Sequence, residues 1–183
     1  MKLFVVAAAC LLSACASLES PDPTSPHYGY GPGWQVEIMR PLTIPAGAAS
    51  VRLQAGRLVA RNSVQEHAPF CVIEVETVGD VPQVLAAGRV TVARVMRHID
   101  PIAVAASRPG PLVRADDGGG DPSFLYYITE FRLRDPTRPE LRSVRCAWNQ
   151  MAPGHRALMR HLTLAEMRGA LGDWVALVPP DAR

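Results

Sequence analysis

The stretch FCVIEVETV, residues 70–78, alternates apolar and polar side chains along most of its length. Cys71, Ile73 and Val75 fall on one face, and the two glutamates fall on the other. Successive side chains of a β-strand point to opposite faces of a sheet, so this period of two predicts a strand with one buried face. We therefore expect a β domain in which Cys71 lies on the core side.

Similar alternation recurs along the chain, in segments that punctuating Gly and Pro residues separate. These segments are residues 34–38, 51–61, 88–96, 125–133, 143–146 and 174–178. The short turn-forming sequence DPTRP, residues 135–139, joins two of them and predicts a hairpin. The pattern indicates six to eight strands.

One helix is expected near the C-terminus. Thr163 and Glu166 have the spacing of a capping box, in which each side chain satisfies a free backbone amide of the first turn. Apolar residues follow at helical spacing, and Gly172 can end the helix. The sequence therefore predicts a mainly-β, single sandwich or barrel-like domain with one short C-terminal capping helix.

The N-terminus has the layout of a secretory signal. Lys2 precedes an apolar run, residues 3–12, which is shorter than the roughly 20 residues that a spanning helix needs. The run closes on Leu12-Ser13-Ala14-Cys15, which resembles the lipobox of bacterial lipoproteins. The alternative is an ordinary signal peptide in which Cys15 is incidental.

The lipobox resemblance implies cleavage after Ala14, lipidation of Cys15 and attachment to a membrane. Residue 16 is Ala rather than Asp, and by similarity to enterobacterial sorting this implies the periplasmic face of the outer membrane. Residues 40–47 and 70–74 are also similar to uncharacterised proteobacterial lipoproteins, a similarity that carries no known activity.

Three parts of the chain follow from this interpretation. Residues 1–14 are the signal peptide, residues 15–33 are a flexible Pro- and Gly-rich tether, and residues 34–183 are the periplasmic β domain. Past the lipobox, Cys71 and Cys146 remain, and an even pair in an oxidising compartment predicts a disulfide. A reactive thiol or a soft metal site is the alternative for these cysteines.

The charge balance gives no indication of a nucleic-acid partner, because 18 Arg face 17 Asp plus Glu once Lys2 is removed. Arginines gather along the expected hairpin, where they present a weak candidate surface for an anionic partner. These candidates are Arg132, Arg134, Arg142 and Arg145. An envelope protein, peptidoglycan or lipopolysaccharide would fit them, and a solvated strand face is the alternative.

Catalytic motifs are not apparent in the sequence. His67, His98 and Asp100 include a base and an orienting carboxylate, but no nucleophile accompanies them. The acidic segment DDGGGD, residues 116–121, lacks the ligand spacing of an EF-hand. Soft copper ligands are spread over Met151, His155, Met159, His161 and Met167, but Pro153-Gly154 interrupt a helix there.

We therefore expect a non-enzymatic, membrane-anchored lipoprotein that needs no cofactor or metal and whose β domain binds or supports another envelope component. The alternative is an envelope enzyme or a copper- or zinc-handling protein, with His67, His98, His155 and the acidic loop, residues 116–121, as candidates.

Overall fold

The computed structural model describes residues 19–102, 123–152, 155 and 157–180. The mainly-β fold with a short C-terminal helix is confirmed. Eight antiparallel strands form one sheet in the order β10-β1-β7-β8-β9-β5-β3-β4. Their bounds are β1 (Gln35–Ile38), β3 (Ser50–Gln54), β4 (Arg57–Val59), β5 (Phe70–Val75), β7 (Gly88–Ile102), β8 (Ser123–Leu133), β9 (Leu141–Ala152) and β10 (Val175–Val178).

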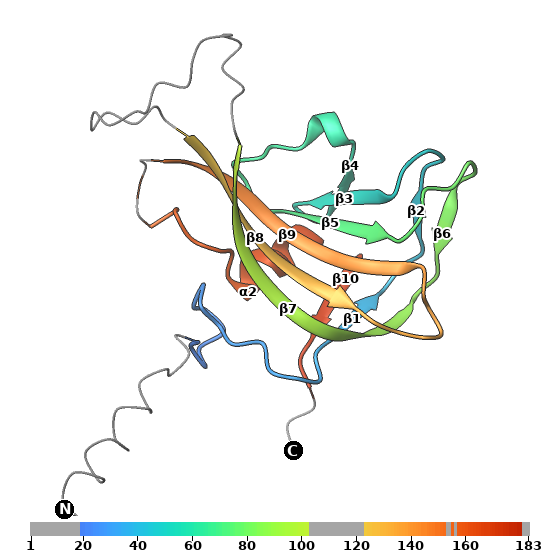
Figure 1. Ribbon diagram of the computed structural model, residues 1–183, viewed down its shortest axis with the longest axis horizontal. Helices are drawn as coiled ribbons and strands as arrows, with labels where there is room; N and C mark the ends of the chain where they lie inside the picture. The colour runs from blue at the N-terminus through green and yellow to red at the C-terminus, as the bar shows by residue number, and fades with distance from the viewer. Residues whose placement is uncertain (1–18, 103–122, 153–154, 156, 181–183) are drawn as a thin grey trace, which may run out of the picture.

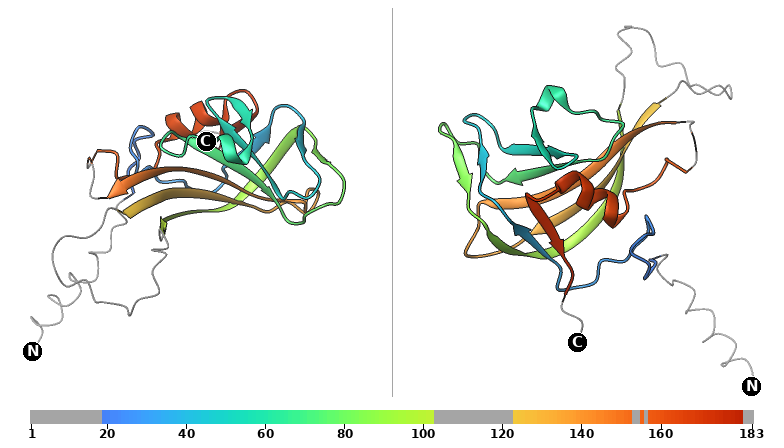
Figure 2. Two further views of the ribbon diagram at one scale, coloured as in Figure 1. Left: turned by 90° about the horizontal axis from the view of Figure 1, so that it is seen from above. Right: turned by 180° about the vertical axis from the view of Figure 1, so that it is seen from behind.

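The large sheet curls strongly, and helix α2 (Leu164–Leu171) lies against its concave face (Figures 1 and 2). The helix packs against β3, β5 and β10, so it spans the space between the two ends of the curled sheet. This arrangement corresponds to the barrel-like form of the prediction. The main hydrophobic core therefore lies between the concave face and α2, and Phe131, Leu53 and Leu171 are among its fully buried side chains.

Two short strands were not among those expected. β2 (Leu42–Ile44) and β6 (Gln83–Leu85) pair with each other in a separate antiparallel sheet. They form an arm beside the curled sheet (Figure 1). Leu42, Ile44 and Leu85 are buried in the main core, and this burial fixes a pair of strands that is only three residues long.

Helix α2 begins as the sequence predicts. The Thr163 hydroxyl accepts from the backbone N–H of Glu166, and the Glu166 carboxylate accepts from the backbone N–H of Thr163 at 2.8 Å. Arg160 donates to both oxygens of the same carboxylate at 2.8 Å. These hydrogen bonds and the Arg160 charge lower the pKa of Glu166, with the hydrogen bond from Arg160 as the largest cause.

The packed part of the chain starts earlier than residue 34. Tyr28 and Tyr30 lie in the segment expected as a tether, yet both pack against the main core. The Tyr30 ring makes edge-to-face contacts with Trp34 and Phe131, with centroids 5.3 and 5.1 Å apart. Arg97 covers the Tyr30 ring and donates to the carbonyl of Tyr28. The C-terminal end of the expected tether is thus part of the folded domain, whereas Cys15 lies outside the described residues.

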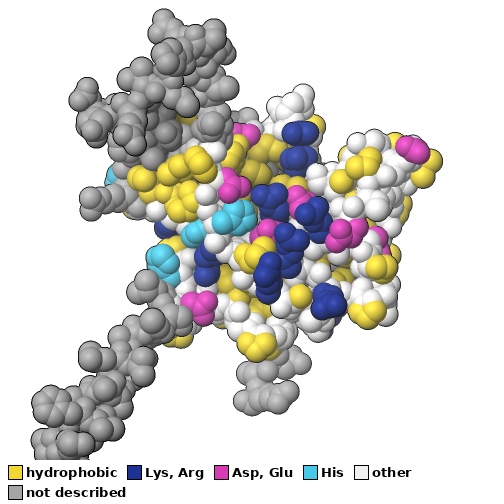
Figure 3. Space-filling model, in the orientation of Figure 1, with side chains coloured by type: hydrophobic (Ala, Val, Ile, Leu, Met, Phe, Trp, Pro, Cys, Tyr) yellow, Lys and Arg dark blue, Asp and Glu magenta, His cyan; other side chains and the backbone are white. Residues whose placement is uncertain are grey.

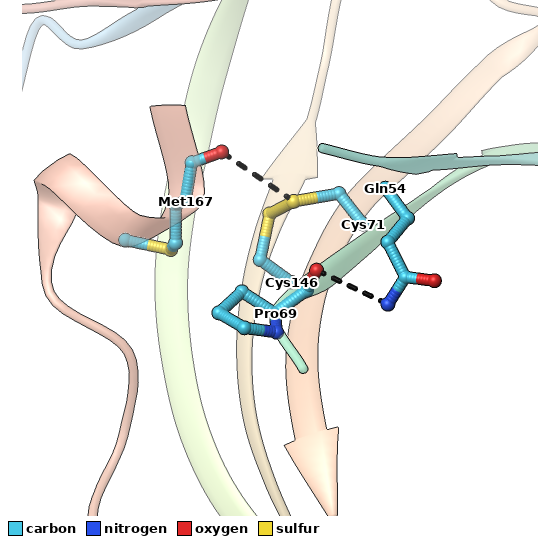
Figure 4. The surroundings of a disulfide bond; sticks show 5 residues. All are labelled: Gln54, Pro69, Cys71, Cys146 and Met167. Atoms are coloured by element: carbon cyan, nitrogen blue, oxygen red, sulfur yellow. Dashed lines mark hydrogen bonds between the residues drawn. A yellow bond between two sulfur atoms is a disulfide. The ribbon is translucent and has the colours of Figure 1, made fainter. Parts of the chain in front are cut away.

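The predicted pairing of the two cysteines agrees with the structure. In the β5–β9 register, Cys71 lies directly opposite Cys146, and their Sγ atoms are 2.06 Å apart, at disulfide distance. Both residues are fully buried on the concave face, and the carbonyl oxygen of Met167 in α2 lies 3.8 Å from Cys71 Sγ (Figure 4). The bridge therefore joins neighbouring strands beneath the helix.

Candidate functional site

The convex outer face of the curled sheet carries a pocket of about 310 Å³. Three arginines, two carboxylates and a tyrosine provide its polar groups, and the rest of its lining is apolar. The lining residues are Arg52, Arg61, Val64, Glu66, Phe70, Val72, Asp100, Tyr126, Ile128, Arg145 and Ala147. The pocket volume is at the lower end of the range that is typical of small-molecule sites, and its lining is more polar than is usual for them.

Strand register explains why these residues meet. On the outer face, Arg52 of β3 lies opposite Val72 of β5, which lies opposite Arg145 of β9. Two residues further along, the next row consists of Phe70, Ala147 and Ile128, from β5, β9 and β8. Because side chains two residues apart share a face, the charged row and the apolar row are neighbours on the same surface. The pocket thus has a floor built on regular strands.

The floor is a second hydrophobic cluster, separate from the main core. Phe70, Ile128 and Ala147 are at most 9% exposed, and Val64, Val72 and Tyr126 pack against them. An outward-facing strand position is usually solvated in a sheet that has one buried face. In β5, β8 and β9, side chains are buried on both faces of the sheet. This part of the outer face therefore differs from an ordinary solvent-exposed sheet face.

A loop from β4 to β5 covers one side of this cluster and includes the 3₁₀ turn Arg61–Ser63. The side chain of Gln54 exchanges two hydrogen bonds with the backbone of Gln65, at 2.8 and 2.9 Å. The backbone N–H of Asn149 in β9 also donates to the carbonyl of Glu66. These contacts fix the loop over the sheet, so the pocket wall exists without a ligand.

Positive charge is concentrated at one end of the pocket. Within the described ranges, neither Arg52 nor Arg61 forms an ion pair with a carboxylate. Burial lowers the pKa of the Arg52 guanidinium, and the nearby positive charge of Arg61 lowers it further, against the opposing effect of Glu74. Glu74 offsets part of this positive charge without forming an ion pair with Arg52 in the described residues, and an anion would relieve the remaining excess.

The third arginine is only partly neutralised. Arg145 Nη1 lies 3.2 Å from Glu74 Oε1, and the other oxygen of Glu74 accepts from the Ser143 hydroxyl at 2.8 Å. The Nε of Arg145 is buried and has no acceptor in the described part of the chain. Arg145 thus retains an unused donor beside the pocket.

The other end of the pocket is acidic and phenolic. The pKa of Tyr126 is raised to about 12, mainly by burial and also by a hydrogen bond with Glu66 and the charge of Glu66, against the lowering effect of a hydrogen bond with Asn149. The phenol therefore stays protonated at neutral pH and donates to the carboxylate. Asp100 lies opposite Tyr126 in the β7–β8 register, and its Oδ2 lies 3.7 Å from Nε2 of His98. The pocket is thus cationic at one end and anionic at the other.

The four arginines expected from the sequence do not form one group. Arg132 and Arg145 lie on the outer face, and each pairs with a carboxylate, Arg132 with Glu130 at 2.6 Å. Arg142 is the extra residue of a β-bulge between β5 and β9, and Arg134 follows the last residue of β8. Of the four, only Arg145 lines the pocket.

Figure 3 shows basic side chains gathered across the middle of this face; all of them are arginines, because the sole lysine is Lys2. The pocket arginines Arg52 and Arg61 were not among the expected site residues. The sequence offered one indication of Arg52 as a site residue, namely that it is an arginine at an outward position of an alternating strand. Nothing in the local sequence shows that the loop carrying Arg61 folds back over that strand.

Of the residues named for the alternative functions, His98 and Asp100 lie together, and the other described candidates do not join them in a metal site. His67 Nδ1 lies 3.2 Å from the backbone carbonyl of Asn149, and Met167 is fully buried in the core, whereas Met151 is about half exposed. Among the described residues, no three His, Cys, Asp or Glu side chains are grouped as a metal site. The acidic segment 116–121 lies outside the described residues.

Comparison with protein-family models, with curated proteins and with solved structures finds no match to this chain. In the part of the chain that the structure describes, no helix has the length and apolar character needed to cross a membrane.

Proposed function

We propose that this chain is a lipid-anchored, non-enzymatic protein of the bacterial cell envelope. Cys15 would carry the lipid, and the β domain would face the periplasm from the outer membrane and bind another envelope component. The motif Leu12-Ser13-Ala14-Cys15 supports the anchor. Attachment through several acyl chains is effectively stable, because each buried methylene contributes about 0.8 kcal/mol.

The observation that carries the binding function is the pocket on the outer face. It combines two arginines that have no carboxylate partner in the described residues with a buried apolar floor. Charged groups beside an apolar surface can bind a ligand. The residues that line the pocket include no Ser, Cys or His that could act as a nucleophile or a base. The proposed binding face is therefore the outer face around Arg52, Arg61 and Arg145.

Metabolic labelling with an alkyne analogue of palmitate tests the anchor. The full chain, expressed in a Gram-negative host, should incorporate the label and sediment with outer membranes in a density gradient. Cys15→Ser should abolish both properties. Cys10→Ser is the matched control, because it removes a neighbouring cysteine of the same apolar run. A Cys15→Ser chain that still incorporates the label would contradict the proposal.

Site-specific photocrosslinking in intact cells tests the binding face. A photoreactive phenylalanine replaces Asn62, an exposed residue of the turn beside the pocket, or Val84, an exposed residue of the β2–β6 arm. The proposal expects an adduct from position 62 that is weakened by Arg52→Gln. Adducts from position 84 alone would place the binding face elsewhere.

A further inference from the structure

The outer-face pocket has three properties that together restrict its ligand: a cationic end, an apolar floor and an acidic far end. Arg52, Arg61 and Arg145 are the cationic groups, and Glu66 and Asp100 are the acidic ones. The floor between them consists of side chains that strands β5, β8 and β9 hold in place. A ligand that matches all three carries negative charge at one end only.

We propose that this pocket binds a single-headed amphipathic anion, with its carboxylate or phosphate group at Arg52 and Arg61 and its apolar body over Phe70, Ile128 and Ala147. This inference deepens the proposed function and rests on the outer face being the binding face. It names the chemical class of the group that is bound.

The head group is assigned to the arginine pair because neither guanidinium group forms an ion pair in the described residues, and the charge of Glu74 offsets only part of their positive charge. Planar guanidinium groups bind carboxylates and phosphates through paired hydrogen bonds, and such charge-assisted bonds are stronger than neutral ones. Arg145 contributes less charge, since Glu74 already pairs with it, but its Nε still lacks an acceptor in the described residues.

The body is assigned to the floor because that surface is apolar, with Phe70, Ile128 and Ala147 at its centre. Each methylene that a ligand places against it strengthens binding by up to about fourfold, as expected for removal of one methylene from water. The pocket volume of about 310 Å³ suits a medium-length alkyl or a single aromatic body rather than a large glycan or a folded segment.

A second anionic group is excluded by the far end. Glu66 accepts a hydrogen bond from Tyr126, and Asp100 lies opposite Tyr126 on the neighbouring strand. A ligand that reaches this end with a carboxylate places like charges together, which is unfavourable where water is displaced. The pocket should therefore bind a ligand with one anionic group more tightly than a ligand with an anionic group at each end.

Calorimetric titration of the full chain in phosphatidylcholine nanodiscs tests the proposal, with empty nanodiscs as the blank. Four probes of equal chain length separate the effects of the head group and of a second anionic group. They are octanoate, octyl phosphate, octan-1-ol and octanedioate. Octanoate, octyl phosphate or both should bind, and the two arms distinguish a carboxylate head group from a phosphate head group. Octan-1-ol and octanedioate should each bind at least fivefold more weakly than the better of the two.

Three variants assign the binding to this pocket. Arg52→Gln and Arg61→Gln should each weaken binding of the preferred anion about tenfold, as expected for loss of one charge-assisted hydrogen bond. Ala147→Leu should also weaken it, because a larger side chain fills the floor. Arg94→Gln is the matched control, since Arg94 is an exposed outer-face arginine that does not line the pocket, and it should leave binding unchanged.

Circular dichroism melting curves establish that each variant is folded. Equal binding of octan-1-ol and of the better-binding anion, or full binding by Arg52→Gln and Arg61→Gln, would overturn the proposal. Weakening by Arg94→Gln to the same extent would also overturn it, because it would indicate attraction by the whole face. Labelling at Cys15 is read independently, so loss of anion binding with an intact anchor refutes this inference alone.

Discussion

Gly56 and Gly172 lie back to back, where the β3–β4 turn meets the end of α2. A Cβ placed on Gly172 would overlap the Cα of Gly56, and the backbone N–H of Gly56 donates to the carbonyl of Ala170 at 3.1 Å. Both glycines also have positive φ, 71° and 57°. The helix is thus joined to the far end of the sheet by direct backbone contact.

Gly172→Ala should therefore destabilise the domain by at least about 2 kcal/mol, because it adds a clash to an unfavourable backbone conformation. Urea unfolding measures the difference. Gly169→Ala is the control: Gly169 lies in the same helix, and a Cβ there meets nothing within 4 Å. That change should stabilise the helix by up to about 1 kcal/mol. Equal effects of the two substitutions would show that the contact is unimportant.

Tyr30→Ala should destabilise the domain by about 2–3 kcal/mol, somewhat less than the loss of a fully buried aromatic residue. The reason is that Tyr30 packs against Trp34 and Phe131 and is covered by Arg97. His27→Ala changes an exposed residue of the same segment and should stay within about 0.5 kcal/mol of the parent. Indistinguishable melting curves for the two variants would assign Tyr30 to the tether.

A non-reduced digest of the purified chain should contain a peptide pair linked through Cys71 and Cys146, as mass spectrometry can verify. The double variant Cys71→Ala with Cys146→Ala should lose about 4 kcal/mol on the chain-entropy model, because the loop spans 75 residues. Dithiothreitol should reduce the pair slowly in the folded domain and rapidly in urea, since both residues are fully buried. Free thiols at both positions in protein isolated without reductant would contradict this prediction.

Stability should decrease as the pH falls from about 6.5 to about 4, and His161 accounts for part of this decrease. The pKa of His161 is lowered to about 4, mainly by burial and also by the nearby charge of Arg97. The unfolded chain takes up a proton near pH 6.5, whereas the folded chain does not do so until about pH 4, so protonation in this range favours unfolding. Solvent screening reduces the effect, because the ring is only half buried.

His161→Phe should reduce that pH dependence, which urea unfolding at pH 7, 6, 5 and 4 measures. The replacement ring can still pack edge-to-face against Tyr127, as the imidazole does with centroids 5.7 Å apart. Unfolding free energies that fall equally steeply in both proteins over this range would assign the effect to other groups. Glu166 has a lowered pKa and loses its own stabilising effect from about pH 4.5 downwards, at the acid end of the series, and this loss is common to both proteins, so it cancels in the comparison.

Local periodicity predicted much of the sheet and the helix. The alternation in β5 and β8 follows directly from side-chain direction in a strand, and the capping box at Thr163 depends on residues three positions apart. Long-range pairing was harder to predict. β2 and β6 are each three residues long, and only their burial in the shared core distinguishes them from loops.

The candidate pocket could not be predicted for a related reason. Phe70 and Ala147 occupy outward strand positions, where the alternation predicts solvent contact. They become a pocket floor because the loop around Glu66 is hydrogen-bonded across β9, an interaction between residues more than 80 positions apart. The sequence therefore pointed to the exposed arginines of the hairpin as the binding residues, and only Arg145 among them lines the pocket.

The pairing of β1 with β10 has a consequence for the order in which the chain is made. β1 lies between β7 and β10, so one of its edges stays without a partner until residues 175–178 have been synthesised. An unpaired strand edge is a template for association with other chains. A chain truncated ahead of Val175 would keep nearly the whole core sequence and still expose that edge. The last strand therefore covers the edge of β1 and becomes the edge strand itself, and at four residues it is short, as edge strands that resist association often are.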